Sequence, residues 1–401
     1  MFEKLILITR QFPYGNSENF LESEIVVLSR YFQEIVIYPS TSADSIRDIP
    51  SNVRVSDQIS VNYSRNIYWS LKSLISKQFF KTIVKYGFRL KSFGAFGSLM
   101  KYIVSYNIYN DFAKILFLDD SQKLIYSYWY SPVVDALVKR KTKKDKIICR
   151  VHRGDIYEET TLLGFYPFRE FSIHQVDQIY SISEHGYHYL AEKYNAHNVL
   201  VSRLGTFDHY TVNVVDESTF SIVSVSNMIP IKRVDLIAKV VLDIAKRYPY
   251  VDFVWNHFGD GVEYRKILDA LDASKPVNLR YVLNGRVPNK AVHNFYMNNP
   301  VNVFINLSES EGIPVSIMEA ISFGIPIVAT DVGATSEIVN ATTGWLLPSN
   351  PSTEEVVTAV SNAMLHPIDR SQIKEFWKTN YSAETNFLDF YRSICQKRDI
   401  V

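Results

Sequence analysis

Short apolar runs rich in β-branched residues alternate with helical patterns along this chain of 401 residues. Many of the runs are continuously hydrophobic, which is typical of strands covered on both faces and therefore of parallel sheets flanked by helices. Strands are expected at 4–8, 34–38, 124–128, 146–151, 178–181 and 198–202, and then at 221–225, 252–258, 279–283, 301–306, 325–329 and 344–347. A break at 205–218 separates the two groups. The pattern predicts two doubly wound α/β domains.

The length of the chain fits two domains, because single hydrophobic cores stop growing at about 250–300 residues. We expect one Rossmann-like domain at 1–205, a second at 206–375, and a C-terminal helix at 376–401 that crosses back to the first domain. Ligands of open parallel sheets bind beyond the carboxyl ends of the strands. The predicted site is therefore a cleft across which the two domains face each other.

Composition narrows the class of protein. Hydrophobic residues make up 47% of the chain and charged residues 21%, ordinary values for a globular protein that argue against disorder. The two cysteines form no disulfide framework and no Cys/His spacing matches a zinc site, which favours the reducing cytosol. The first apolar run ends at Arg10 and lacks a cleavage site, and it is far shorter than the ~20 residues of a membrane span. A cytoplasmic protein is expected, neither secreted nor threaded through a bilayer.

A basic, aromatic segment lies between Asp57 and Asp111, where the sequence has no acidic residue. A helix there would place lysines every four residues beside apolar side chains: Lys77, Lys81, Lys85, Phe80, Ile83 and Val84. One interpretation is a surface that lies on anionic lipid headgroups, and the other is a helical layer with an ordinary solvated face. Nucleic acid is not an expected partner, because no recognition motif accompanies the charge.

The densest motif spans residues 308–337, SESEGIPVSIMEAISFGIPIVATDVGATSE. Pro314 and Gly324 frame a predicted helix that runs from Val315 to Phe323. The open N-terminus of such a helix binds phosphate through free amides. Glu311 and Glu319 can accept hydrogens from sugar hydroxyls. A framed turn with surface carboxylates is the alternative.

This block resembles the signature of the retaining glycosyltransferases of family GT4, which have the GT-B fold. The resemblance implies two doubly wound Rossmann-like domains, of which the first takes the acceptor and the second binds the nucleotide sugar. It also implies that Glu311 reaches the donor sugar or the leaving group and that Glu319 binds the ribose. Further donor contacts fall on the turn Gly312, Ile313, Pro314 and Val315.

A second match, SVSNMIPIKRVD at 224–235, looks like the diphosphate loop of that family. Lys232 occupies the place of the lysine that neutralises the leaving group. Asn227 stands where many members have arginine, and Arg233 stands where glycine is commoner and could restore the charge. No Asp-x-Asp motif occurs, so no metal and no cofactor are expected, and Lys232 with helix dipoles must neutralise the diphosphate.

Matches also occur in the first half of the chain. Residues 12–20, FPYGNSENF, look like a segment of capsule and exopolysaccharide transferases, and imply acceptor-side roles for Gly15, Asn16, Ser17 and Glu18. His152 and Asp155 follow an expected strand and resemble the His-x-x-Asp loop, which implies that His152 lies close to the transferred sugar and that Asp155 is on the acceptor side. Arg286 falls where the base is usually held, although it could equally be a loop cation.

The expected enzyme is a metal-independent glycosyltransferase that moves a sugar, with retention, from a UDP- or GDP-sugar to a glycan or a polyprenyl-diphosphate-linked oligosaccharide. The catalytic residues would be Glu311, His152 and Lys232. Bacterial surface polysaccharide synthesis is the expected setting, peripheral on the inner face of the membrane. Two alternatives stay open: a sugar-nucleotide epimerase of the same fold, and a non-catalytic nucleotide-sugar binder.

Overall fold

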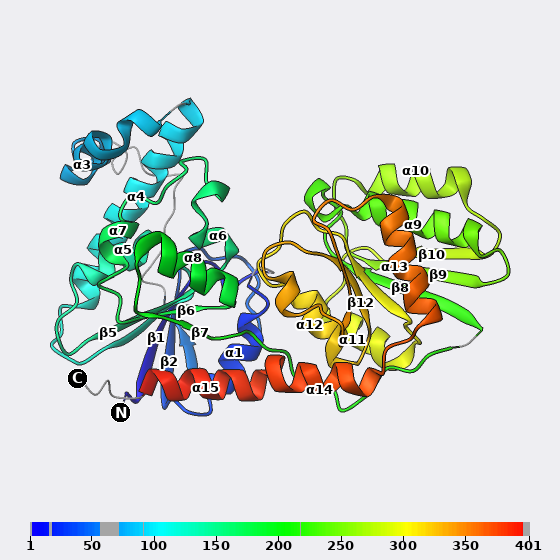
Figure 1. Ribbon diagram of the computed structural model, residues 1–401. Coiled ribbons are helices and arrows are strands. Elements are labelled where there is room, and N and C mark those ends of the chain that lie inside the picture. The colour runs from blue at the N-terminus through cyan, green and yellow to red at the C-terminus, as the bar shows by residue number, and fades with distance from the viewer. Residues whose placement is uncertain (1, 16–17, 57–71, 91, 217, 396–401) are drawn as a thin grey trace. The chain divides into compact units, whose positions relative to one another are not determined.

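The computed structural model describes residues 2–15, 18–56, 72–90, 92–216 and 218–395 (Figure 1). Contacts between residues divide the chain into two compact units, Met1–Arg203 with Phe387–Val401, and Leu204–Asn386. The predicted boundaries are 205/206, two residues after the observed 203/204, and 375/376, eleven residues before the observed 386/387. Each unit contains one parallel sheet with helices packed against it, so the expected doubly wound α/β fold is confirmed. The facing of the two domains across a cleft stays a prediction.

The first unit is built on a seven-stranded parallel sheet of order β3-β2-β1-β4-β5-β6-β7. Its strands are β1 (Lys4–Thr9), β2 (Glu34–Pro39), β3 (Val53–Val55), β4 (Leu124–Ser127), β5 (Lys146–Val151), β6 (Gln178–Ser181) and β7 (Val199–Val201). Its helices are α1 (Leu21–Leu28), α3 (Lys77–Tyr86), η2 (Gly87–Arg89), α4 (Phe93–Leu116), α5 (Pro132–Val138), α6 (Arg153–Ile156), η3 (Glu158–Thr160), α7 (Arg169–Ser172) and α8 (Glu184–Tyr194).

Both faces of this sheet are buried, as its continuous hydrophobicity predicted. Successive side chains of a strand point to opposite faces. In β1, Leu5 and Leu7 pack with α1 and the C-terminal helix, whereas Ile6 and Ile8 pack with α4 and α5. The alternation explains why every second position, polar in a half-exposed strand, is apolar here.

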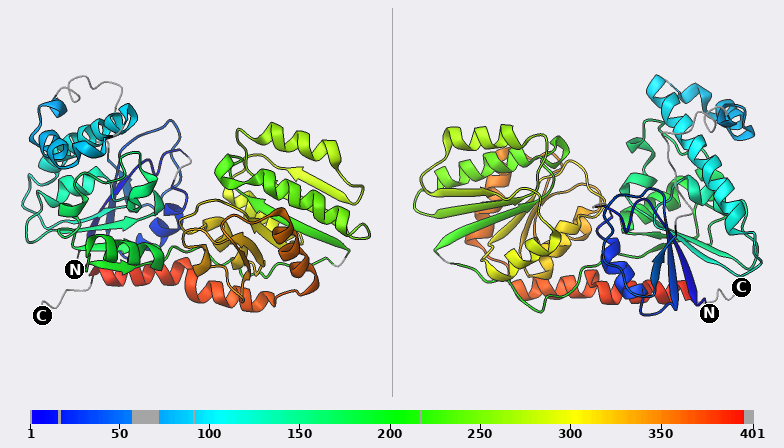
Figure 2. Two further views of the ribbon diagram at one scale, coloured as in Figure 1. Left: turned by 45° about the horizontal axis from the view of Figure 1, so that its top comes forward. Right: turned by 180° about the vertical axis from the view of Figure 1, so that it is seen from behind.

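The second unit contains a six-stranded parallel sheet of order β10-β9-β8-β11-β12-β13. Its strands are β8 (Thr219–Val225), β9 (Asp252–Phe258), β10 (Leu279–Leu283), β11 (Val303–Asn306), β12 (Ile327–Thr330) and β13 (Gly344–Leu347). Its helices are η4 (Pro230–Lys232), α9 (Val234–Arg247), α10 (Tyr264–Ser274), α11 (Asn289–Asn298), α12 (Val315–Ser322), η5 (Thr335–Glu337), α13 (Thr353–Leu365) and α14 (Arg370–Tyr381). Figure 2 shows the layers of each unit from two further sides.

The chain then ends differently from the single helix that the sequence led us to expect. Helix α14 stops at Tyr381, and α15 (Ala383–Cys395) begins after Ser382. The break has a local cause, because Thr206 takes over the backbone groups there: its N–H donates to Tyr381 O (3.0 Å) and its carbonyl accepts from Ala383 N (3.0 Å). Gly205 is required beside it, since a Cβ would lie 2.5 Å from Ala383 N.

Two further details differ from expectation. Strand β3 was not predicted; it has three residues and lies at the edge of its sheet, too short for a hydrophobic pattern. Pro314 is the N-cap of α12, and Val315 is its first residue. None of the described helices combines the length and the apolar run that crossing a bilayer requires.

A buried ion pair ties the first sheet to the helices that cover it. The Arg150 guanidinium on β5 contacts Glu24 Oε1 on α1 at 3.0 Å, and both side chains are fully buried. Arg150 also donates to Tyr126 OH (2.7 Å) and Ser202 O (2.7 Å), and it lies 4.5 Å from the ring centre of Phe390 on α15. Burial raises the pKa of Glu24, although Arg150 and Tyr126 lower it.

We predict that Arg150→Met destabilises the protein by about 3–5 kcal/mol, because it leaves the Glu24 carboxylate buried without its cation. The double variant Glu24→Leu/Arg150→Met removes both charges and should recover a large part of that loss. Urea unfolding of the three proteins measures both effects. An Arg150→Met protein as stable as wild type would show that this pair does not stabilise the first unit.

Candidate functional site

The candidate site lies at the carboxyl edge of the second sheet, between β8 and β11. These two strands are neighbours, yet the chain winds from β8 toward β10 on one side and from β11 toward β13 on the other. At such a switch point the loops that follow the two strands diverge and leave room for a ligand. Lys232 follows β8 and Glu311 follows β11.

An ion pair joins the two loops at this point. Lys232 Nζ lies 2.6 Å from Glu311 Oε1, and the two side chains are 24% and 13% exposed. Asn306 Nδ2 approaches the same oxygen at 3.4 Å. Both side chains reach solvent, so a ligand can replace the contact between them. Its anionic group would bind the lysine and its hydroxyl groups would donate to the carboxylate.

The backbone holds this pair in register. Glu309 N donates to Ile231 O (2.8 Å), so the loops that carry Glu311 and Lys232 are bonded directly. Gly333 has φ of 59° and presses on the same loop, since a Cβ there would lie 2.0 Å from Glu311 O. Only glycine fits such a position without strain.

Arg233 is positioned as a clamp on the loops. It has a left-handed backbone (φ 48°) and directly precedes the helix that begins at Val234. Its guanidinium donates to Glu309 Oε1 (3.0 Å), Ser349 O (2.8 Å) and Asn350 Oδ1 (3.1 Å). The guanidinium thus joins the loop after β11 to the loop after β13, and its donor-binding role stays a prediction.

The N-terminus of α12 adds backbone donors at the same edge. Ile317 N and Met318 N both donate to Pro314 O. The amides of Val315 and Ser316 come before the first intrahelical bond, so they point out of the helix and favour an anion. Gly312 O accepts from Ala334 N (2.9 Å), which fixes the turn, and Ile313 is buried beneath it.

Glu319 occupies a different place from Glu311. It is 7% exposed and its Oε1 accepts from Asn289 Nδ2 at 2.6 Å, with His293 Nε2 at 3.5 Å. Both partners belong to α11, and the sequence analysis missed them because their spacing carries no motif. Arg286 and Asn227 are exposed in the loops after β10 and β8.

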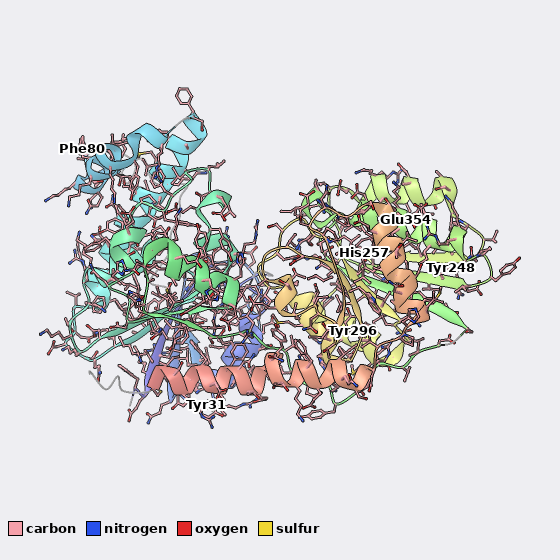
Figure 3. All side chains as sticks on the ribbon, in the orientation of Figure 1. Tyr31, Phe80, Tyr248, His257, Tyr296 and Glu354 are labelled. Atoms are coloured by element: carbon pink, nitrogen blue, oxygen red, sulfur yellow. The ribbon has the colours of Figure 1, made fainter. Side chains whose placement is uncertain are left out.

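His257, labelled in Figure 3, lies on β9 and contacts the end of β8 and the residue that follows it. Its Nε2 lies 3.1 Å from Ser226 O, an acceptor, so Nε2 carries the hydrogen. Its Nδ1 therefore accepts from the Ser224 hydroxyl (2.8 Å), and the same Ser224 Oγ accepts from Trp255 Nε1 (2.9 Å). The network requires the neutral imidazole, and burial lowers the pKa of His257 to about 4.

The corresponding edge of the first sheet contains the other predicted residues. Loops after the neighbouring strands β1 and β4 meet at Glu18, whose carboxylate accepts from Gln11 N (2.7 Å) and Phe12 N (2.7 Å) and also from the Trp129 indole. Glu18 therefore shapes the loop after β1. Gly15 lies in that loop with φ of 60°, whereas Asn16 and Ser17 lie outside the described residues.

His152 and Asp155 follow β5 at this edge. The Asp155 carboxylate accepts from His152 N (2.6 Å) and Tyr130 N (2.8 Å), and burial raises its pKa to about 7. The His152 ring lies 4.4 Å from Trp129 and 5.5 Å from Phe20, centre to centre. Burial lowers the pKa of His152 well below its usual value, and its two ring nitrogens have no partner among the described residues.

Among the described residues, no group of three or more His, Cys, Asp and Glu side chains could hold a metal ion. The cationic groups that the structure places at the switch point of the second sheet are Lys232 and Arg233.

We predict that protonation of His257 costs stability in acid. Its pKa is about 4 in the folded protein and about 6.5 when unfolded, so the unfolded chain binds this proton more tightly. Its contribution is complete above about pH 6.5, and about 3 kcal/mol is lost as the pH falls to 4. Unfolding of wild type and His257→Gln from pH 7.5 to 4 measures this, with exposed His366→Gln as the control. An equal pH dependence of wild type and His257→Gln would contradict the prediction.

Comparison with known proteins finds a family match for the segment that carries this site. Residues 219–366 match the family model of glycosyl transferases group 1. One component of phosphatidylinositol N-acetylglucosaminyltransferase from Arabidopsis thaliana is 24% identical over 263 residues, which cover 62% of this chain and 56% of that protein. The GtfA component of UDP-N-acetylglucosamine–peptide N-acetylglucosaminyltransferase from Streptococcus pneumoniae is 26% identical over 163 residues, 39% of this chain and 31% of that protein.

Solved structures extend the similarity of fold to nearly the whole chain. The lipopolysaccharide outer core galactosyltransferase WaaB superposes with a TM-score of 0.70 and 13% identity, covering 98% of this chain and 99% of that one. The matched curated relatives are covered over only about half of their length or less. The segment that carries Lys232, Glu311 and Glu319 matches the glycosyl transferases group 1 family.

Proposed function

We propose that this protein is a retaining glycosyltransferase that transfers a sugar from a nucleoside diphosphate sugar to a hydroxyl of a glycan or a lipid-linked oligosaccharide. The observation that carries the proposal is the Lys232–Glu311 ion pair at the switch point of the second sheet, beside the N-terminus of α12. The match of residues 219–366 to glycosyl transferases group 1 supports it.

In this proposal the donor breaks the ion pair and becomes the new partner of both side chains. The diphosphate takes the Lys232 ammonium and the outward amides of Val315 and Ser316. Glu311 is then released to accept hydrogens from hydroxyls of the sugar. Donor binding therefore places a cation against the diphosphate and a carboxylate against the sugar. In the free protein the charges of Lys232 and Glu311 balance each other.

The same groups assist the reaction. The bond between the anomeric carbon and the phosphate oxygen breaks, the sugar becomes oxocarbenium-like, and negative charge develops on the departing diphosphate. Lys232 and the amides stabilise that charge more strongly in the transition state than in the bound donor. The acceptor oxygen attacks from the face that the phosphate leaves and gives its proton to the leaving phosphate, so the configuration is retained without an enzyme nucleophile. From the resemblance of its loop, His152 is proposed to act on the transferred sugar.

The proposal also names a donor, an acceptor and a location. The name of the GtfA relative specifies UDP-N-acetylglucosamine, which favours a UDP-sugar over a GDP-sugar. Glu319, held by Asn289, is proposed to accept the ribose hydroxyls, and Arg286 to contact the base. A lipid-linked acceptor, metal-independent turnover, and a place in bacterial surface polysaccharide synthesis on the inner face of the membrane complete the proposal.

We predict that Lys232→Ala and Glu311→Ala each lower kcat about 10²–10³-fold, the usual effect of removing one group that stabilises transition-state charge. Steady-state assays with the donor identified below measure this. Lys239→Ala, an exposed lysine on α9, removes the same charge away from the site and should keep wild-type turnover. Wild-type rates in both site variants would remove the assignment.

We predict that one class of nucleoside diphosphate sugar raises the melting temperature, because a ligand that binds only the folded state stabilises it by about 2.7 kcal/mol at 100 times its Kd. A thermal-shift panel of UDP-, GDP- and ADP-sugars, with and without EDTA, identifies it. The shift should survive EDTA and disappear in Lys232→Ala. A shift without any transfer or donor hydrolysis would instead indicate a non-catalytic binder, and an altered sugar without acceptor would indicate an epimerase.

A further inference from the structure

We infer that the outer face of α3 and the start of α4 form a docking surface for an anionic lipid bilayer, an inference that rests on the proposed lipid-linked acceptor for its purpose. We call this the α3–α4 surface; it comprises Ile75, Lys77, Phe80, Lys81, Val84 and Phe93. Figure 1 shows α3 and the first turns of α4 at the end of the first unit away from its sheet, and the views of Figure 2 agree.

The two helices are well defined without help from this outer face. Ser76 caps α3 by accepting from Phe79 N (3.1 Å), and Ser92 caps α4 by accepting from Ala95 N (3.1 Å). The inner side of the hairpin forms a small core of its own: Phe79, Ile83, Tyr86, Leu90, Ala95, Leu99, Ile103, Leu163 and Phe165. Ile83, expected beside the lysines, thus packs inward. The packing of these two helices therefore does not depend on the outer apolar residues.

Those outer residues are large, apolar and open to solvent. Phe93 is 98% exposed, Val84 86%, Ile75 79% and Phe80 58%. Figure 3 labels Phe80 on α3 at the edge of the first unit. Single exposed apolar residues need no explanation, but several on one helical hairpin indicate a surface that another phase or molecule covers.

The charge around them has one sign. Lys77 and Lys81 are exposed on the same face of α3 as Phe80 and Val84, and the sequence has no acidic residue at 58–110. The acidic groups that approach from packed elements already have partners: Glu170 on α7 contacts Lys85 and accepts from Tyr86 OH, and Asp111 contacts Lys72 and Lys114. The outer face therefore remains cationic.

An anionic bilayer is the partner that suits both properties. The apolar side chains enter the boundary between headgroups and acyl chains, and lysine stems follow them while their ammonium groups stay with the lipid phosphates. A second copy of this face would bring Lys77 and Lys81 against lysines of the same sign. A nucleic acid would pair with the lysines and leave Val84, Ile75 and Phe93 exposed.

The test is co-sedimentation of the full chain with phosphatidylcholine vesicles with and without about one-quarter phosphatidylglycerol. We expect binding to the anionic vesicles, weakened by 0.5 M salt, and little binding to the neutral ones. Lys77→Gln/Lys81→Gln should lower the partition coefficient about 30-fold, at about fivefold for each basic side chain near such a surface. Val84→Ser/Phe93→Ser should lower it at least about tenfold.

Matched controls are Lys239→Gln/Lys246→Gln and Val262→Ser/Val277→Ser, exposed pairs of the same types in the second unit, which should bind as wild type does. Every variant should keep its melting temperature and its donor-induced thermal shift, so loss of vesicle binding is independent of the donor site. Absent vesicle binding by wild type, equal binding by all variants, or self-association lost in Val84→Ser/Phe93→Ser would each overturn the inference. Vesicle binding without any donor shift would instead contradict the proposed function alone.

Discussion

The ion pair between Lys232 and Glu311 is the contact on which the candidate site depends. It exists because the second sheet reverses its winding between β8 and β11, which brings the ends of two strands that are far apart in sequence to one edge. The bond from Glu309 N to Ile231 O fixes the separation of the loops. Around it, Arg233 joins Glu309 to Ser349 and Asn350, His257 donates to Ser226 O, and Gly333 lies against Glu311 O. The contact itself joins two side chains, and the Asn306 amide approaches the same Glu311 oxygen.

The two sheets share a winding pattern but use their carboxylates differently. Each has a glutamate in a loop at its switch point, Glu18 in the first and Glu311 in the second. Glu18 accepts from backbone N–H groups of its own loop, which no ligand can displace without unfolding that loop. Glu311 accepts from a lysine and an amide side chain, both of which can rotate away. The Glu18 carboxylate is thus engaged by backbone of its own loop, whereas the Glu311 carboxylate is engaged by side chains.

Sequence alone predicted the sheets and the motif residues that lie at the carboxyl edge of the second sheet. Five of the expected strands, such as 146–151 and 252–258, match the observed ones at both ends. What it missed depends on contacts distant in sequence. The interruption at Ser382 depends on Thr206, and the partners of Arg233 include Ser349 and Asn350. The left-handed backbone at Arg233 could not be predicted from the sequence, because arginine rarely adopts this conformation.

The lysines of the α3–α4 surface have different surroundings from the lysine of the proposed donor site. In the proposed donor site, Lys232 lies beside a carboxylate that balances its charge in the free protein. Lysines that contact an extended anionic surface need no carboxylate beside them, because the surface attracts the sum of their charges. A helix selected only for solubility would mix acids with its lysines at four-residue spacing, which stabilises it. Helix α3 has no acid and instead exposes phenylalanine and valine between its lysines. This composition is unfavourable for a helix face in water alone. It favours the interface of an anionic bilayer, where hydrocarbon and charged headgroups are adjacent.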